Sequence, residues 1–188
     1  DVSPNVRLTN KEVERVKFFA LKNKLSYFKH IVLFECSPES TQSKMNLESA
    51  LTITKKITER HKNVCFILSS RHAIEGNNSQ IIDGSELTFR ENAELTKYCT
   101  FLIGCSSGIT WLSTSDWAKK LPTLQVLDIN SLLYVGLSYD FKINGFNNSH
   151  IIEISEKNID LIEVIMGEIF SGNFENAKKK YHIDYKPN

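Results

Sequence analysis

The segment TKYCTFLIGCSSGITWLSTS, residues 96–115, is the part of the chain that decides its fold. Residues 100–106 have the apolar composition and length of a buried strand, and residues 109–118 have the apolar spacing of a helix. From residue 104 to residue 108 the chain consists of glycine, cysteine and serine residues alone. A buried strand that turns sharply into a helix is the repeating unit of an α/β domain.

The chain on either side of this segment alternates between the same two patterns. Further helices are predicted over residues 10–25, 47–60, 91–98, 157–170 and 174–185. Further strands are predicted over residues 30–36, 63–70, 80–85, 123–128 and 150–155. Residues 130–149 are rich in Asn, Ser and Gly and are predicted to form a long loop.

The predicted strands are continuous apolar runs, which is typical of strands buried on both faces of a parallel sheet. The sequence therefore predicts one α/β domain over residues 1–188: a Rossmann-like, doubly wound, mostly parallel sheet of about six strands with helices on both faces. Ligands of such sheets bind beyond the carboxyl ends of the strands. The residues that follow each strand are therefore the candidates for a site.

Composition limits the classes of partner. The chain has 188 residues, of which 41% are hydrophobic and 24% charged, and its formal net charge is +1. A near-neutral charge argues against binding to nucleic acid or to a membrane surface, and no apolar run has the roughly 18 residues of a membrane-spanning helix. We expect a soluble domain in the cytoplasm.

The four cysteines, Cys36, Cys65, Cys99 and Cys105, are widely spaced and form no C-x-x-C pair. Three of them belong to predicted strands, where a thiol packs as a small apolar group. We interpret them as reduced and structural, which agrees with a cytoplasmic protein. No spacing of His, Cys, Asp and Glu indicates a metal site.

The turn at Ser106, Ser107 and Gly108 has two interpretations. A strand followed by Ser-Ser-Gly and a helix can direct backbone N–H groups and hydroxyls at an anion, most plausibly a phosphate. Alternatively, one serine caps the helix and binds nothing else. A third, less favoured hypothesis makes Ser107 the nucleophile of a hydrolase with His72, but the G-x-S-x-G elbow of such enzymes is missing.

Other strand ends carry side chains that suit a phosphate or a ribose. Ser37, Ser40 and Gln42 follow the first strand, but such residues are also ordinary loop formers. Ser70 and Arg71 follow the second strand, where a guanidinium could bind phosphate or simply face solvent.

The segment around residues 88–91 offers another charged pair. Arg90 and Glu91 lie at the predicted start of a helix, where a Glu also suits the helix dipole without any ligand.

Taken together, ENAELTKYCTFLIGCSSGITWLSTS resembles the donor-side segment of GT-B glycosyltransferases, in particular the heptosyltransferase-like group. In that group a helix of the type E-x-x-x-L precedes a strand that ends in G-x-[DS]-S-G. The upstream stretches FECSPESTQS, LESALTITKKI and NVCFILSS follow the same order, so the resemblance covers residues 31–128 or so.

The resemblance implies the C-terminal, donor-binding half of a two-domain enzyme that transfers a sugar from a nucleoside-diphosphate sugar without a metal or another cofactor. The missing N-terminal domain would bind a glycan, lipid-linked or protein acceptor and hold the catalytic base, so this half alone would be inactive. The domain could then lie peripherally at a membrane through that missing half. The donor-binding positions that the resemblance carries over are Ser37, Ser40, Gln42, Ser70, Arg71, Arg90, Glu91, Ser106, Ser107, Gly108 and Ile109.

The sequence departs from the family pattern at two positions. Relatives often have Asp before the Ser-Gly pair and His a few residues later, whereas this chain has Ser106 and Trp111. Because of these departures, the resemblance does not determine which nucleoside base and which sugar the donor would carry. An alternative of a different class is a non-catalytic phosphosugar- or nucleotide-binding module of the sugar-isomerase type, whose strand-to-helix turn has a similar Ser-Gly-x-Thr.

Overall fold

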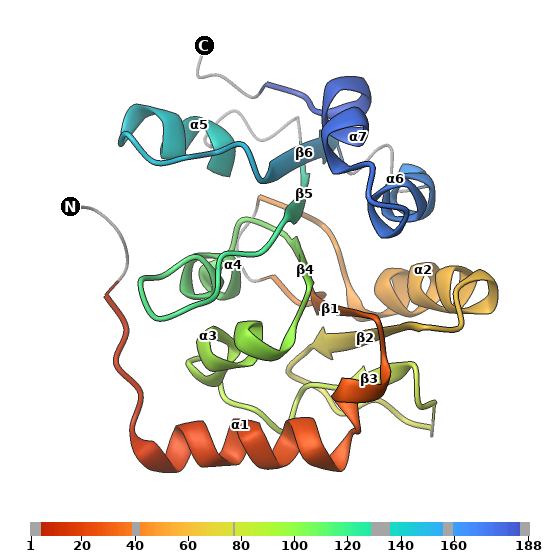
Figure 1. The fold of residues 1–188 in the computed structure, drawn as a ribbon, viewed down its shortest axis with the longest axis vertical. Coiled ribbons are helices and arrows are strands. Elements are labelled where there is room, and N and C mark those ends of the chain that lie inside the picture. The colour runs from red at the N-terminus through yellow and green to blue at the C-terminus, as the bar shows by residue number, and fades with distance from the viewer. Residues whose placement is uncertain (1–4, 39–41, 77, 129–135, 156–159, 185–188) are drawn as a thin grey trace.

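The computed structural model describes residues 5–38, 42–76, 78–128, 136–155 and 160–184. Its centre is a six-stranded parallel sheet in the order β3-β2-β1-β4-β5-β6 (Figure 1). The strands are β1 (His30–Glu35), β2 (Val64–Ser69), β3 (Ile81–Asp83), β4 (Phe101–Gly104), β5 (Thr123–Leu127) and β6 (Ile151–Ser155). The predicted Rossmann-like α/β architecture is thereby confirmed.

Helices connect the strands and cover both faces of the sheet. They are α1 (Asn10–Lys22), α2 (Leu47–Arg60), α3 (Glu91–Leu95), α4 (Gly108–Ser113), α5 (Leu137–Ile143), α6 (Leu161–Phe170) and α7 (Phe174–Tyr181), with the short 3-10 turns η1 (Leu25–Tyr27) and η2 (Thr96–Tyr98). In Figure 1, α2, α6 and α7 lie on one side of the sheet, and α3, α4 and α5 on the other.

Local sequence signals explain where the two longest helices begin. Thr9 precedes α1. Its hydroxyl accepts the backbone N–H of Glu12, and its own backbone N–H donates to the Glu12 carboxylate, which completes a capping box. Asn46 caps α2 in the simpler way, by accepting the N–H of Ser49 at 2.9 Å. Both helices begin where the sequence predicts, because a cap depends on only a few neighbouring residues.

Two hydrophobic cores hold the layers together. One packs α2, α6 and Ala177 of α7 against side chains such as Phe34 and Phe66 on one face of the sheet. The other packs α1, Leu25 and Leu95 against the opposite face. Alternate residues of β1, β2 and β4 enter different cores, which explains why these strands are apolar along most of their length.

The predicted loop over residues 130–149 is wrong in part, because α5 lies within it. Residues 129–135 are outside the described part of the chain. The backbone N–H of Ser138 at the start of α5 donates to Glu153 Oε1 of β6 at 3.0 Å, and Leu137 is fully buried. The first turn of this helix is held by Glu153, a side chain from a later strand, so no local sequence pattern predicts the helix.

All four cysteines are buried, in agreement with their interpretation as packed, structural thiols. Among the described residues, no helix is long and apolar enough to cross a membrane.

The strand order sets the position of the site. The chain proceeds outward from β1 to β2 and β3, then returns to the other side of β1 as β4. The crossovers that leave β1 and β4 therefore run in opposite directions, and a crevice opens between the two strand ends. The segments after β1, β2 and β4 meet there.

Candidate functional site

A cavity of about 640 Å³ lies at the carboxyl edge of the sheet. Its walls come from the segments that follow β1, β2, β3 and β4. The residues that line it are Ser37, Ser69, Ser70, Arg71, Ser85, Leu87, Phe89, Asn92, Ser107, Gly108 and Ile109. A volume of this size is typical of a small-molecule pocket.

The ends of β1 and β2 are joined on the cavity wall. Ser37 Oγ and Ser70 Oγ lie 3.2 Å apart, within hydrogen-bond distance. Ser70 Oγ also accepts the backbone N–H of His72 at 3.2 Å, which turns the chain directly after Arg71. Arg71 is exposed and lines the cavity together with Ser37 and Ser70.

The turn after β4 also lines the cavity and has an unusual backbone. Ser106 adopts a left-handed conformation with φ 53°, which is uncommon for a residue with a side chain. Ser107 is the N-cap of α4 and accepts the N–H of Ile109 at 3.4 Å. Ser107 therefore caps α4, and Ser107, Gly108 and Ile109 also line the cavity.

Two buried side chains from neighbouring strands hold the turn from beneath. Glu35 of β1 accepts the N–H of Cys105 at 2.9 Å on Oε2. Gln125 of β5 accepts the N–H of Ser106 at 2.9 Å. These two backbone N–H groups point into the sheet, so they do not point at a ligand in the cavity, contrary to what the turn alone suggests.

The carboxyl of Glu35 is completely buried and lies in a polar cluster. Its Oε2 also accepts the hydroxyl of Thr110 in α4 at 2.6 Å, while its Oε1 has no hydrogen-bond partner among the described residues. Burial raises the pKa of Glu35, and the hydrogen bonds from Thr110 and Cys105 oppose that rise. Burial together with the nearby Glu35 also raises the pKa of the Cys36 thiol, to about 12, which leaves it protonated and unreactive at neutral pH.

The structure brings Ser37, Ser70, Arg71, Ser107, Gly108 and Ile109 of the predicted residues together in the cavity. Ser106 is buried in the same turn, but it is not a lining residue. Ser40 lies outside the described residues. Gln42 lies beyond β5, where its backbone oxygen accepts the N–H of Asp128 at 2.6 Å.

Arg90 and Glu91 contact α1 and the segment before it. The Arg90 Nε lies 3.1 Å from Glu12 Oε1, and another guanidinium nitrogen donates to the backbone oxygen of Arg7. Glu91 is buried, accepts the N–H of Thr88 at 2.6 Å and lies 3.7 Å from a guanidinium nitrogen of Arg15. Both residues fix α3 to α1, and neither lines the cavity.

The sequence analysis missed lining residues next to those it chose. Phe89 and Leu87 join the predicted Ile109 in an apolar part of the wall, and Asn92 and Ser85 add polar atoms. Phe89 and Asn92 lie on either side of Arg90 and Glu91, so the segment was recognised but its inward-facing residues were not. The sequence signal that could have found this part of the wall was a large apolar residue, Phe89, next to the charged pair. In the structure its side chain is 53% exposed.

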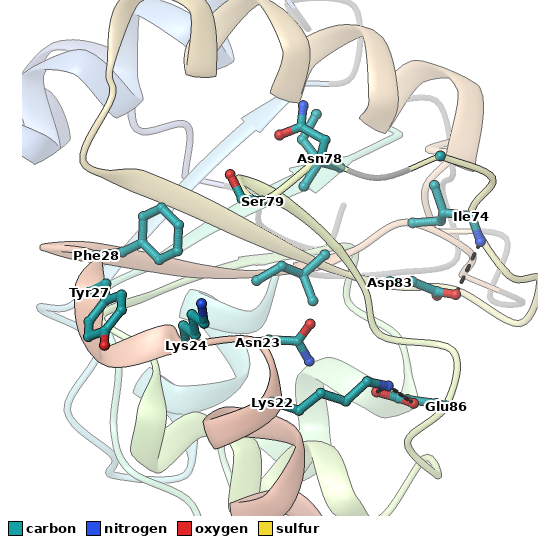
Figure 2. Close-up of a pocket in the computed structure, with 13 residues that line it drawn as sticks. Lys22, Asn23, Lys24, Tyr27, Phe28, Ile74, Asn78, Ser79, Asp83 and Glu86 are labelled. Atoms are coloured by element: carbon teal, nitrogen blue, oxygen red, sulfur yellow. Dashed lines mark hydrogen bonds and ion pairs between the residues drawn. The ribbon is translucent and has the colours of Figure 1, made fainter.

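A second cavity of about 1010 Å³ lies beside β3, between that strand and the end of α1 (Figure 2). Figure 2 shows Lys22 extended to the carboxylate of Glu86, at 2.9 Å, and Asp83 facing the backbone nitrogen of Ile74, at 3.2 Å. Asp83 also accepts the N–H of Ser85 at 2.8 Å. These groups serve local structure, and no residue predicted for the site lies here.

Comparison with known proteins adds no family to this description. No family model matches the chain, and neither the curated proteins nor the solved structures searched contain a match. The strand order and the composition of the cavity at the carboxyl edge therefore carry the functional argument.

Proposed function

We propose that this domain binds the diphosphate of a nucleoside-diphosphate sugar in the 640 Å³ cavity, as the donor-binding part of a metal-independent glycosyltransferase. The observation that carries the proposal is the convergence of Ser37, Ser70, Arg71 and Ser107 on that cavity from three different strand ends. A guanidinium with several hydroxyls matches the charge and the acceptor oxygens of a diphosphate.

The rest of the cavity suits the remainder of such a donor. Leu87, Phe89 and Ile109 offer an apolar surface, and an aromatic ring can stack on a planar base or on the carbon face of a sugar. Asn92 and Ser85 add a few polar atoms to this surface, as is typical of a pocket that orients a small ligand.

In sugar transfer the leaving diphosphate gains negative charge as its bond to the sugar breaks, so donors held in advance near that charge lower the barrier. In our proposal Arg71 supplies positive charge, and the hydroxyls of Ser37, Ser70 and Ser107 supply hydrogen bonds. The turn contributes through its Ser107 hydroxyl, because the N–H groups of Cys105 and Ser106 are already bonded. The acceptor and its general base would come from a second domain across the cavity.

Titration calorimetry of the chain with UDP, GDP and ADP, and with glucose 1-phosphate as a simple sugar phosphate, tests this proposal. We expect one nucleoside diphosphate to bind, and Arg71→Ala and Ser107→Ala each to weaken its affinity by at least tenfold, since one hydrogen bond to a charged group contributes about 1.5–3 kcal/mol. Arg60→Ala, on α2, is the control for loss of an arginine. Ser79→Ala is the control for loss of a hydroxyl and lines the other cavity.

The outcomes separate the alternatives. Binding of glucose 1-phosphate alone supports the phosphosugar-binding module instead of a transferase domain. Binding that Ser79→Ala weakens and Ser107→Ala does not would move the ligand to the cavity beside β3. If none of the four compounds binds, the proposal is wrong.

A further inference from the structure

The carboxyl of Glu35 lies on the sheet side of the turn whose other side faces the cavity. Its Oε2 is 2.9 Å from the backbone nitrogen of Cys105 and 2.6 Å from the hydroxyl of Thr110. Between these two residues in the chain, Ser107 and Gly108 line the cavity. An anion in the cavity and an ionised Glu35 would thus be separated only by one turn of backbone.

Solvent does not reach this carboxyl to screen its charge. Glu35 is 0% exposed, and Oε1 lacks a hydrogen-bond partner within the described chain. Two like charges that are close together and partly shielded from water repel strongly, and the repulsion falls when one of them takes up a proton. Burial already favours the neutral form of Glu35, because it raises the pKa of this carboxyl.

The other titratable and charged groups around Glu35 come from several elements. Cys36 adjoins it in the chain, and Cys105 donates its thiol to the Glu35 backbone oxygen at 3.3 Å. The charges of Glu35 and of Asp83, at the end of β3, both contribute to the raised pKa of the Cys36 thiol.

Two further sets of charges lie at neighbouring strand ends. Arg71 and His72 follow β2, and the pair Lys44–Asp128, 3.3 Å apart, lies beyond β5. The segment that forms α4 carries no charged side chain.

We propose that Glu35 is the positioning residue of the anion-binding turn, and that its carboxylate takes up one proton from solvent when an anion binds in the cavity. The inference rests on the proposed function, since it requires the cavity to bind an anion. Proton and anion then bind cooperatively: anion affinity rises as pH falls and levels off once Glu35 is neutral. By reciprocity, the bound anion raises the affinity of Glu35 for its proton.

Sulfate is the probe for this coupling, because its own charge does not change over the pH range used. Calorimetry of the chain with sulfate from pH 5 to 9, in two buffers of different ionisation enthalpy at each pH, measures affinity and proton uptake without any substitution. We expect affinity to fall by at least tenfold between the low-pH plateau and pH 9, with net proton uptake in the range between.

Two variants identify the group that titrates. Glu35→Gln retains a side-chain oxygen for Cys105 and Thr110 but cannot ionise. This variant should bind sulfate with a constant affinity across the range, and more tightly than the native chain at pH 9. His72→Gln is the control for a second titrating group near Arg71, and it should leave the proton uptake unchanged.

The results distinguish this inference from the proposed function. Sulfate binding that is independent of pH, or proton uptake that His72→Gln abolishes, overturns the role of Glu35 and leaves the anion site in place. If Glu35→Gln does not fold, the proton uptake of the native chain together with His72→Gln still decides the matter. If sulfate and the nucleoside diphosphates all fail to bind, both proposals are wrong.

Discussion

Gly108 lies directly against the ring of Phe89. A Cβ atom built on Gly108 would lie 2.6 Å from Phe89 Cζ and 2.9 Å from Cε2, closer than carbon atoms approach without a shift. Both residues line the 640 Å³ cavity, one from the start of α4 and the other from the segment before α3. The missing side chain at Gly108 therefore lets the ring of Phe89 form the cavity wall.

The first prediction concerns Gly108→Ala. The new methyl group should push the ring of Phe89 aside, but the atoms it meets are the far end of an exposed side chain. We therefore expect the free energy of unfolding to change by less than about 1 kcal/mol, while affinity for the nucleoside diphosphate falls several-fold. Denaturant unfolding and calorimetry measure the two quantities. In a Phe89→Ala background the substitution should have little further effect on binding, and an undiminished effect there would contradict this explanation.

Gly104→Ala should instead destabilise the whole domain. Its Cβ would lie 2.3 Å from Gln125 Nε2 and 2.5 Å from Thr110 Oγ1, both of them buried and unable to move freely. Inserting a methyl group into a packed interior typically costs about 1–3 kcal/mol, and here it also disturbs the groups that hold the turn. Urea unfolding of the variant and the native chain measures the loss.

Gly167→Ala is the matched control for that substitution. Gly167 lies within α6, and the nearest atom to a new Cβ is His61 Nε2 at 4.0 Å, an ordinary contact. Since alanine is favoured over glycine in a helix, we expect a gain of about 0.5–1 kcal/mol in unfolding free energy. A loss of stability in both variants would show that added volume alone does not explain the Gly104 result.

From the buried carboxyl of Glu153 we expect the folded state to lose stability as the pH rises. Burial raises the pKa of Glu153 from 4.5 to about 7, and its Oε2 has no hydrogen-bond partner in the part of the chain that the structure describes. Because the folded state holds this proton more tightly than the unfolded state, the stabilisation is complete below pH 4.5 and disappears as pH rises to about 7. The shift corresponds to about 3 kcal/mol.

Glu153→Gln tests this directly, since a neutral amide can still accept the N–H of Ser138. We expect the variant to gain stability relative to the native chain as pH rises from 4.5 to 8, with most of the change complete by pH 8. Urea unfolding at several pH values measures the difference. A difference that stays constant with pH would mean that Glu153 does not titrate in this range.

For His182 we expect the opposite pH dependence: its contribution to folding stability is lost as the pH falls. Its Nδ1 accepts the backbone N–H of Glu153 at 3.0 Å, so this contact requires the neutral imidazole. Burial lowers the pKa of His182 below 6.5, and the folded state therefore binds this proton less tightly than the unfolded state. The stabilisation from this residue is present above pH 6.5 and is lost as pH falls through its folded pKa.

The variant His182→Gln should cost about 1 kcal/mol at pH 8, the typical value of one hydrogen bond. The cost should shrink as the pH is lowered from 8 to 5, because protonation of His182 stabilises the unfolded state of the native chain more than the folded state. Thermal or urea unfolding at pH 8 and pH 5 provides the comparison. A cost that grows on acidification would contradict the neutral imidazole.

Much of the fold could be predicted because its signals are local. Thr9 and Asn46 mark the starts of α1 and α2 through hydrogen bonds to residues three positions along the chain. The apolar runs predict all the strands of the sheet within a residue or two at each end. The helix α5 could not be predicted this way, because Glu153, which binds its first turn, lies in a later strand.

The sequence could likewise predict only part of the candidate site. Polar residues after the strands identified Ser37, Arg71 and Ser107, since parallel strands end at one edge. The same rule also selected Arg90 and Glu91, whose side chains the structure directs to α1 instead. A sequence pattern places a residue near an edge, but it does not determine which neighbour its side chain reaches.

By itself, then, the sequence determined the α/β alternation, the parallel sheet and the strand ends beside which the cavity lies, because these depend on periodicity and on nearby residues. Only the tertiary structure decided what the turn of residues 104–108 contacts. Glu35 and Gln125 lie 69 and 20 residues or so from that turn along the chain, yet β1 and β5 flank β4 and bring both side chains beneath it. The Ser-Ser-Gly turn thus faces the cavity on one side and a buried carboxyl on the other, since strand order, not sequence distance, determines which side chains meet.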